Sequence, residues 1–561
     1  MGSSLLPWVM SKAGTMIMRV TVVKLPDRTL RRYIEFPNFY IIWMHRCLET
    51  QELIVSIFSE VADLGDESSY ASLAALARTC QAFKNPALDA LWRTQDGLRP
   101  LVNLFPAKGE GDQEVCLQLL MLHCLSLKFS KPPQISMSEW FRIVPYASRV
   151  KVFMLDGDPE GALPHVWHAL AMSRPDSTSF LFPNLQHLSW VGDETRTSFI
   201  RLVLPPTLIR LELVVWLASE EVTSSTGSIL RSLGHFCPSL QEFSLRGDHD
   251  IPWRLSFMNA LSQWVNLRRL TLDRPPSPAA FGYMNRLEYL HISSNSEEPE
   301  KLNTPVVLPT LRELKFEGNQ LNWVTSFLSS IQSSCHLETV DIEVNLYEEP
   351  VLHPWTKLLK VLGCCNSHTL TSLSVTIADS DYVYPGQDHH HQKCYPNQEA
   401  ISPLLALSNL IHLKLRPYLG FDIDDEVLRQ MSLAFPHLRS LELGRLTLPW
   451  TVSSRITLVG LIPLIVNCPQ LHHLGIIIDA TIIPDTCIPT STPNTILKTL
   501  EVGRSRISSP VDVATFLMDL FPNVTRIVHG WDYPWGGLSG NESEAWDIVG
   551  LCMEKFRPRG R

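Results

Sequence analysis

The sequence predicts an α/β solenoid, in which short parallel strands and helices alternate along the chain. Three observations predict this fold class. An L-x-x-L-x-L pattern, with other apolar residues in place of some leucines, recurs fourteen times between positions 150 and 524, at a mean spacing of about 29 residues. A helical pattern precedes many of the copies, and a proline often separates that helix from the copy. One helix and one strand per repeat, stacked side by side, account for all three.

Each copy of the pattern is expected to end in a short strand. In Leu208-Ile-Arg-Leu211-Glu-Leu213 the last two apolar positions alternate with polar ones. This two-residue period is typical of a strand with one buried face. The copies begin at Val150, Leu185, Leu208, Leu240, Leu267, Leu287, Leu311, Leu337, Leu370, Leu410, Leu438, Leu471, Leu497 and Val524.

The helices are expected directly before the strands, for example over 228–236, 427–435 and 513–521. Pro238, Pro436 and Pro522 follow these stretches. Proline cannot continue a helix and biases the residue before it toward an extended backbone. This arrangement predicts a leucine-rich-repeat horseshoe. The alternative is a doubly wound sheet of ordinary βαβ units, against which the recurring pattern argues.

The repeats are not uniform. Their spacing varies, and the asparagine that many leucine-rich repeats carry after the strand is clear only at Asn319. The chain is therefore similar to the long, divergent, helix-containing subclass. We expect the solenoid over 146–530, with an inserted polar loop at 379–397 and a C-terminal cap at 531–561.

Residues 44–105 predict three short helices before the solenoid. The first has one apolar stripe, and the third opens with Asn85 as N-cap and Pro86 as its first helical residue. So few helices bury little surface, so we expect a partner or the solenoid to cover an apolar face that remains. The stripes comprise Leu53, Ile54, Ile57, Phe58 and Val61 in the first helix, Leu73, Leu76, Ala77 and Cys80 in the second, and Leu88, Leu91 and Trp92 in the third.

The remaining segments are less informative. Residues 106–145 are expected to form a helical linker or an N-terminal cap of the solenoid. Residues 1–43 fit neither module, and we interpret them as a lineage-specific extension or the product of a wrongly assigned start. A peptide from 1–43 in native protein, detected by mass spectrometry, would refute the second interpretation.

The order of apolar residues in 44–105 resembles an F-box. The phrase LAALARTCQAFKNPALDALWR especially resembles the F-box proteins abundant in mushroom-forming fungi, which carry divergent leucine-rich repeats downstream. With the repeats, the resemblance covers most of the chain from about Met44. The F-box pattern comprises Leu48, Glu52, Leu53, Ile57, Phe58, Leu73, Leu76, Ala77, Cys80, Phe83, Ala87, Leu91 and Trp92.

In that family the F-box docks onto the small Skp-type adaptor of a cullin–RING ubiquitin ligase, and the repeats hold a protein target. The resemblance therefore implies a non-enzymatic substrate-recognition subunit. This chain has Gln51 where the family usually has a proline that presets the helix start. Two alternatives remain open: a helical cap that only seals the solenoid, and a repeat scaffold with no ubiquitin link. The residues assigned to adaptor binding are Leu48, Glu52, Leu53, Ile57, Phe58, Leu73, Leu76, Cys80, Phe83, Leu91 and Trp92.

A target is expected on the concave face, where the residue between the two strand apolars points outward in every repeat. This row is polar, has charges of both signs and lacks a titratable pair suited to catalysis. It suits protein–protein contact. The row comprises Ser189, Glu212, Ser244, Thr271, His291, Lys315, Asp341, Ser374, Lys414, Glu442, Gly475 and Glu501, and the target-binding assignment is made for its charged members and His291.

Composition excludes several classes of protein. The chain has 48 basic and 57 acidic residues, a net charge of −9 and a pI near 6.1, so nothing favours nucleic acid or an anionic membrane. No apolar run reaches the ~18 residues that span a bilayer, and the first 25 residues lack a secretory signal. We expect a cytoplasmic or nuclear protein with reduced cysteines.

No enzyme motif is present, and no cofactor or metal is expected. His389-His390-His391-x-x-Cys394 is a cluster of metal-ligand types, but no second pair completes the four donors that zinc requires. A hydrolase or metal enzyme with its site in the 379–397 loop is therefore the least favoured alternative. Cys364 and Cys365 follow an apolar helical run and are interpreted as buried packing residues.

Overall fold

The structure is a computed structural model that divides the chain into two compact units, Met1–Thr94 and Gln95–Arg561. The described residues are 50–104, 135–155, 163–175, 180–193, 197–216, 231–247, 261–275, 281–294, 306–319, 321–331, 336–346, 353–365, 368–379, 396–417, 420–444, 454–484, 493–530 and 540–556. The expectations for 1–43, for most of 106–145 and 379–397, for the histidine cluster and for 531–539 lie outside them.

Three helices form the described part of the first unit: α2 (Gln51–Asp63), α3 (Glu67–Leu76) and α4 (Gln81–Trp92). Helix α2 begins at Gln51, directly after the extended N-cap Thr50, so Gln51 occupies the first helical position, where proline is best tolerated. Gly65 ends this segment with a φ of 69°, a conformation that favours glycine. Asp66 caps α3 by accepting a hydrogen bond from the Ser69 backbone N–H at 2.7 Å.

The expected start of the third helix is wrong. Helix α4 begins at Gln81, with Cys80 as its extended N-cap, and Pro86 lies inside it. Proline at this position removes one hydrogen bond, the one to the carbonyl of Ala82. The earlier start forms the extra turn that carries Phe83, whose ring meets Phe58 edge-on at 5.5 Å. Cys80 is consequently not part of the second helix's stripe and is exposed.

Fifteen strands of the described residues form one sheet, and they follow one another in chain order. Every described pairing between successive strands from β2 onward is parallel. A doubly wound sheet is thereby excluded, because its strand order reverses. The strands are β1 (Thr94–Asp96), β2 (Val152–Leu155), β3 (His187–Asp193), β4 (Arg210–Trp216), β5 (Glu242–Gly247), β6 (Arg269–Leu272), β7 (Tyr289–Ser294), β8 (Glu313–Gly318), β9 (Thr339–Leu346), β10 (Ser372–Asp379), β11 (His412–Arg416), β12 (Ser440–Leu443), β13 (His473–Ile476), β15 (Thr499–Gly503) and β17 (Arg526–His529).

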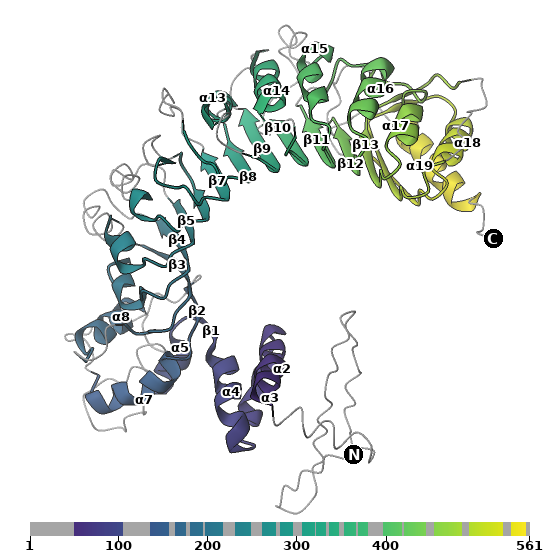
Figure 1. Cartoon of the computed structure of the whole chain (residues 1–561). Helices are drawn as coiled ribbons and strands as arrows, with labels where there is room; N and C mark the ends of the chain where they lie inside the picture. Colours follow the sequence, from purple (N-terminus) through teal and green to yellow (C-terminus); the bar gives the residue numbers. More distant parts are fainter. Residues whose placement is uncertain are drawn as a thin grey trace, which may run out of the picture. The chain divides into compact units, whose positions relative to one another are not determined.

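The fourteen strands after β1 coincide with the fourteen predicted copies, so the solenoid prediction is confirmed. Within the second unit the strands line the inner, concave side and the helices the outer side (Figure 1). The sequence groups residues 95–104 with the three helices, but they fall in the second unit, where β1 is the first strand of the sheet.

The helices of the second unit end where proline predicts. Helix α16 (Asp425–Ala434) stops before Phe435-Pro436, and α18 (Pro510–Leu520) stops before Phe521-Pro522. Helix α14 (His353–Cys365) corrects one expectation, because Cys364 is exposed and not a packing residue. The other helical segments are α5 (Arg99–Val102), α7 (Met137–Ala147), α8 (Leu163–Met172), η1 (Ile200–Val203), η3 (Leu261–Gln263), α13 (Leu321–Ile331), α15 (Gln398–Ile401), η5 (Ser402–Ala406), α17 (Leu461–Asn467) and α19 (Gly540–Lys555).

Side chains directly before the first leucine of several repeats join neighbouring repeats. The amide of Asn409 donates to the carbonyl of His368 at 2.7 Å, and that of Asn523 donates to the carbonyl of Thr495 at 2.7 Å. These bonds satisfy backbone carbonyls that the parallel strands leave unpaired at the turn. Asn184, Thr207, Asn266, Thr310 and Thr369 make equivalent bonds.

Helix α19 covers the last strand of the sheet. It lies against α18 and β17 and buries Trp546, Val549 and Met553, which share one face. The Trp546 indole N–H donates to the carbonyl of Ser505 at 2.9 Å. Nearby, β14 (Asp479–Ala480) and β16 (Arg506–Ile507) form a separate two-stranded parallel ladder.

Candidate functional site

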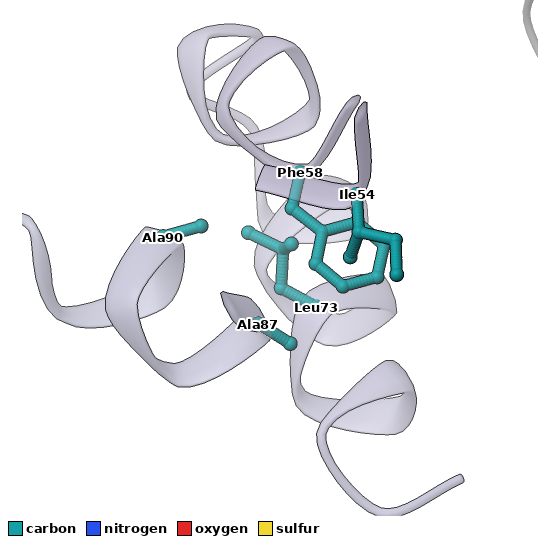
Figure 2. Packing of buried hydrophobic residues seen from close by; sticks show 5 residues of the cluster. All are labelled: Ile54, Phe58, Leu73, Ala87 and Ala90. Carbon is teal, nitrogen blue, oxygen red and sulfur yellow. The ribbon is translucent and has the colours of Figure 1, made fainter. Parts of the chain in front are cut away.

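The core of the helical unit divides the apolar residues of α2 into two sets. Ile54 and Phe58 are only 2% and 3% exposed and lie close to Leu73 of α3 and Ala87 and Ala90 of α4 (Figure 2). Four residues separate Ile54 from Phe58, so they share one helix face. The single stripe expected from the sequence is therefore split, because this face alone is covered by α3 and α4.

The second set forms an exposed apolar stripe on α2. Leu53 is 44% exposed, Ile57 39%, and Leu64, the C-cap residue, 69%. Their spacings of four and seven residues place them on the same side of the helix. Glu60, three residues after Ile57, adds a carboxylate at the margin of this stripe. An apolar stripe with a charged margin suits contact with another protein.

The residues assigned to adaptor binding occupy three environments. Glu52, Leu53, Ile57 and Cys80 are exposed. The others are buried in whole or in part or lie outside the described residues: Phe58, Leu73 and Trp92 are buried, Leu76, Phe83 and Leu91 pack half-buried against the core, and Leu48 is not described. Of the assigned residues, the first group is thus the one accessible to a partner.

Sequence reasoning did not assign Leu64, Val55 or Tyr70, which are also exposed. Leu64 could have been found, because it follows Ile57 by seven residues, which is two helical turns. Val55 is 45% exposed but lies on the opposite side of α2 from Leu53, since two residues correspond to 200° of rotation.

The concave row is formed as predicted. The strand registers place Glu212 beside Ser244, His291 beside Lys315 and Lys315 beside Asp341. Lys414 lies beside Glu442, and Gly475 lies beside both Glu442 and Glu501. The apolar residues that flank the row residue on each strand are buried, so the row residues lie on the face opposite the helices.

Charges near the C-terminal end of this row compensate one another. Arg416 contacts Glu442 at 2.5 Å, and the His473 Nε2 lies 3.1 Å from Glu442 and 3.9 Å from Glu501. The hydrogen bond with Glu442 raises the pKa of His473 despite partial burial. Burial opposes ionisation of Glu442, but the His473 bond and the Arg416 charge outweigh it and lower the pKa of Glu442. Because Gly475 has no side chain, a hollow forms there, and Arg416, Glu442 and Glu501 line it.

Charges near the N-terminal end are also paired. Arg210 contacts Glu212 on its own strand and Glu242 on the next strand at 3.6 Å. The guanidinium of Arg269 lies 4.0 Å from the centre of the Tyr289 ring, a cation–π contact.

Among the described residues, no group of three or more histidine, cysteine or acidic side chains could hold a metal ion. No helix in the described part of the chain is long and apolar enough to cross a membrane. What the geometry offers is two surfaces: an apolar stripe on a three-helix unit, and a polar row along a solenoid.

The fold of the second unit defines a leucine-rich-repeat-like α/β solenoid. No family model matches the chain, and no curated protein matches it. Solved structures similar to it include the Rad7–Elc1 complex of yeast, with 17% identity over 65% of this chain and 82% of that chain and a TM-score of 0.28. A protein of Bacteroides fragilis shows 14% identity over 59% and 68%, with a TM-score of 0.24. The Drosophila Toll–Spätzle complex shows 12% identity over 69% and 54%, with a TM-score of 0.26.

Proposed function

We propose that this protein is the substrate-recognition subunit of an SCF-type (Skp–cullin–F-box) ubiquitin ligase. The helical unit docks a Skp-type adaptor, and the concave face of the solenoid binds a protein target. Binding of both brings lysines of the target near the conjugating enzyme and raises their effective concentration there. Ubiquitin chemistry belongs to the partner proteins, and this chain contributes no catalytic residue.

The observation that carries the proposal is the exposed stripe of Leu53, Ile57 and Leu64 on α2. The resemblance of 44–105 to an F-box assigns Leu53 and Ile57 to the adaptor-facing helix. The core of the unit is complete without them, because Ile54 and Phe58 supply the contacts of α2 to α3 and α4. Their exposure therefore serves no described intramolecular purpose, which supports a role in binding a partner.

The experiment is co-purification of the full chain with a Skp-type adaptor from a mushroom-forming fungus. Leu53→Asp places a charge in the stripe and is expected to lower adaptor binding at least tenfold. Val55→Asp is the matched control, because Val55 is equally exposed on the opposite side of α2. Binding that survives Leu53→Asp, or that both variants reduce equally, would remove the assignment of this stripe. If the wild-type chain does not bind the adaptor, the alternative function, a repeat scaffold with no ubiquitin link, is favoured.

A further inference from the structure

The central part of the concave face carries an excess of acidic groups. Strand β8 contributes Glu313, Lys315 and Glu317, and β9 contributes Asp341 and Glu343. The formal charge of these five residues is −3. We name them the central acidic surface. The concave-face residues of the strands on either side include no acidic, lysine or arginine side chain. They are Tyr289, His291 and Ser293 on β7, and Ser372, Ser374 and Thr376 on β10.

The four carboxylates of this surface share a single cation, Lys315. Lys315 is engaged by Glu317, with 2.7 Å between Nζ and Oε1. The charge of Asp341 also acts on Lys315 and helps to raise the pKa of that lysine, whereas Glu313 and Glu343 make no ion pair within the described part of the chain. The register also places Glu317 directly beside Glu343, and like charges in directly opposed positions destabilise a sheet. A partner that supplied positive charge would relieve this repulsion.

A separate observation comes from His291, next to Lys315 in the concave row. Its side chain is 9% exposed, and its Nε2 lies 3.5 Å from Glu317 Oε2 without a hydrogen-bond partner in the described residues. Burial, together with the charges of Lys315 and Arg246, lowers the pKa of His291 against the opposing effect of Glu317. The imidazole is therefore neutral near pH 7 and leaves the excess of carboxylates uncompensated.

The rest of the row contrasts with this region. Arg210 contacts both Glu212 and Glu242 on β4 and β5, and Arg416 and His473 engage Glu442. Glu313 and Glu343 lie instead on β8 and β9. These strands stand in the middle of the strand order of the sheet (Figure 1).

We propose that the central acidic surface binds a lysine- and arginine-rich segment of the target protein. This inference rests on the proposed function in treating the concave face as the target-binding surface. Neighbouring strands are about 4.8 Å apart, so a chain lying across β8 and β9 brings successive cationic side chains near Glu313, Asp341 and Glu343. Such a contact selects partners by charge, accelerates association and weakens with salt.

The test uses the purified full chain and a fluorescein-labelled 12-residue peptide of alternating lysine or arginine and glycine. Binding is measured by fluorescence anisotropy at low and high salt. The test variant is Glu313→Gln/Asp341→Asn/Glu343→Gln. The matched control, Asp519→Asn/Glu544→Gln/Glu554→Gln, removes the same charge from exposed positions on α18 and α19. We expect at least a tenfold loss of affinity in the test variant and less than a twofold change in the control.

Three results would overturn the proposal. In the first, the test variant binds the peptide as the wild type does. In the second, the control loses as much affinity as the test variant, which would mean that the peptide responds only to the net charge of −9 and not to this surface. Calcium ions could also bind at micromolar concentration to the wild type but not to the test variant, which would make the surface a metal site. Adaptor co-purification separates the two proposals: Leu53→Asp is expected to leave peptide binding unchanged, and the test variant to leave adaptor binding unchanged.

Discussion

Two isoleucines of α2 provide a sharp test of how the helical unit is built. Ile54 is 2% exposed and Ile57 is 39% exposed, although three residues separate them. Ile54→Ala removes three buried carbons from the contact with Leu73 and leaves a cavity, so it should cost about 3 kcal/mol. Ile57→Ala removes the same atoms from a surface position and should cost less than about 0.5 kcal/mol.

Hydrogen exchange of the full chain, read by mass spectrometry on peptides from 51–94, measures both variants. A cost of about 3 kcal/mol corresponds to more than a hundredfold faster exchange through opening of the unit, and about 0.5 kcal/mol to less than threefold. Peptides from the solenoid serve as the internal control and should be unchanged. If Ile57→Ala accelerated exchange as much as Ile54→Ala, the division of α2 into a buried face and an exposed stripe would be wrong.

Three other predictions concern the solenoid. Asn494→Ala removes three hydrogen bonds of a buried side chain and should lower the free energy of unfolding by about 3 kcal/mol. The loss is measured as a lower midpoint of guanidinium unfolding, and an unchanged midpoint would contradict this prediction. Gly247→Ala should also destabilise, because its Cβ would lie 2.1 Å from the Val215 carbonyl oxygen at a φ of 152°; wild-type stability would show that this contact is absent. The raised pKa of His473 stabilises the fold below its unfolded value near 6.5 and ceases to do so as the pH rises through the folded value. The unfolding midpoint should therefore fall more between pH 6 and pH 8 in the wild type than in His473→Gln, and parallel curves would exclude this role.

Sequence reasoning located the strands of the solenoid correctly because their information is local. A leucine at a fixed offset, alternating with polar residues, must face the core in every repeat. A proline after the helix, often as part of Phe-Pro, ends that helix. The register of the concave row follows from the same repetition, since equivalent residues of successive repeats pair. Glu212, Lys315, Glu442 and Glu501 could therefore be placed in one row without coordinates.

Other features depended on contacts between residues distant in sequence. Many leucine-rich repeats carry an asparagine after the strand, whereas in this structure asparagine and threonine side chains directly before the first apolar residue of a repeat bond to the preceding repeat. The start of α4 was misplaced by five residues, from Asn85–Pro86 to Cys80–Gln81. Local preference favours proline at the first turn, but the contact of Phe83 with Phe58 favours an earlier start.

The repeating amino-acid pattern alone determined that this chain forms a solenoid, how many strands follow one another after the first, and which residues face its concave side. Only the tertiary structure decided which apolar residues of α2 remain exposed and which carboxylates of the concave row lack a partner. The physical reason is that the exposure of a side chain and the pairing of a carboxylate both depend on which side chains the neighbouring elements place against it. Helices α3 and α4 bury Ile54 and leave Ile57 exposed, and Arg416 neutralises Glu442, while no described cation pairs with Glu313 or Glu343.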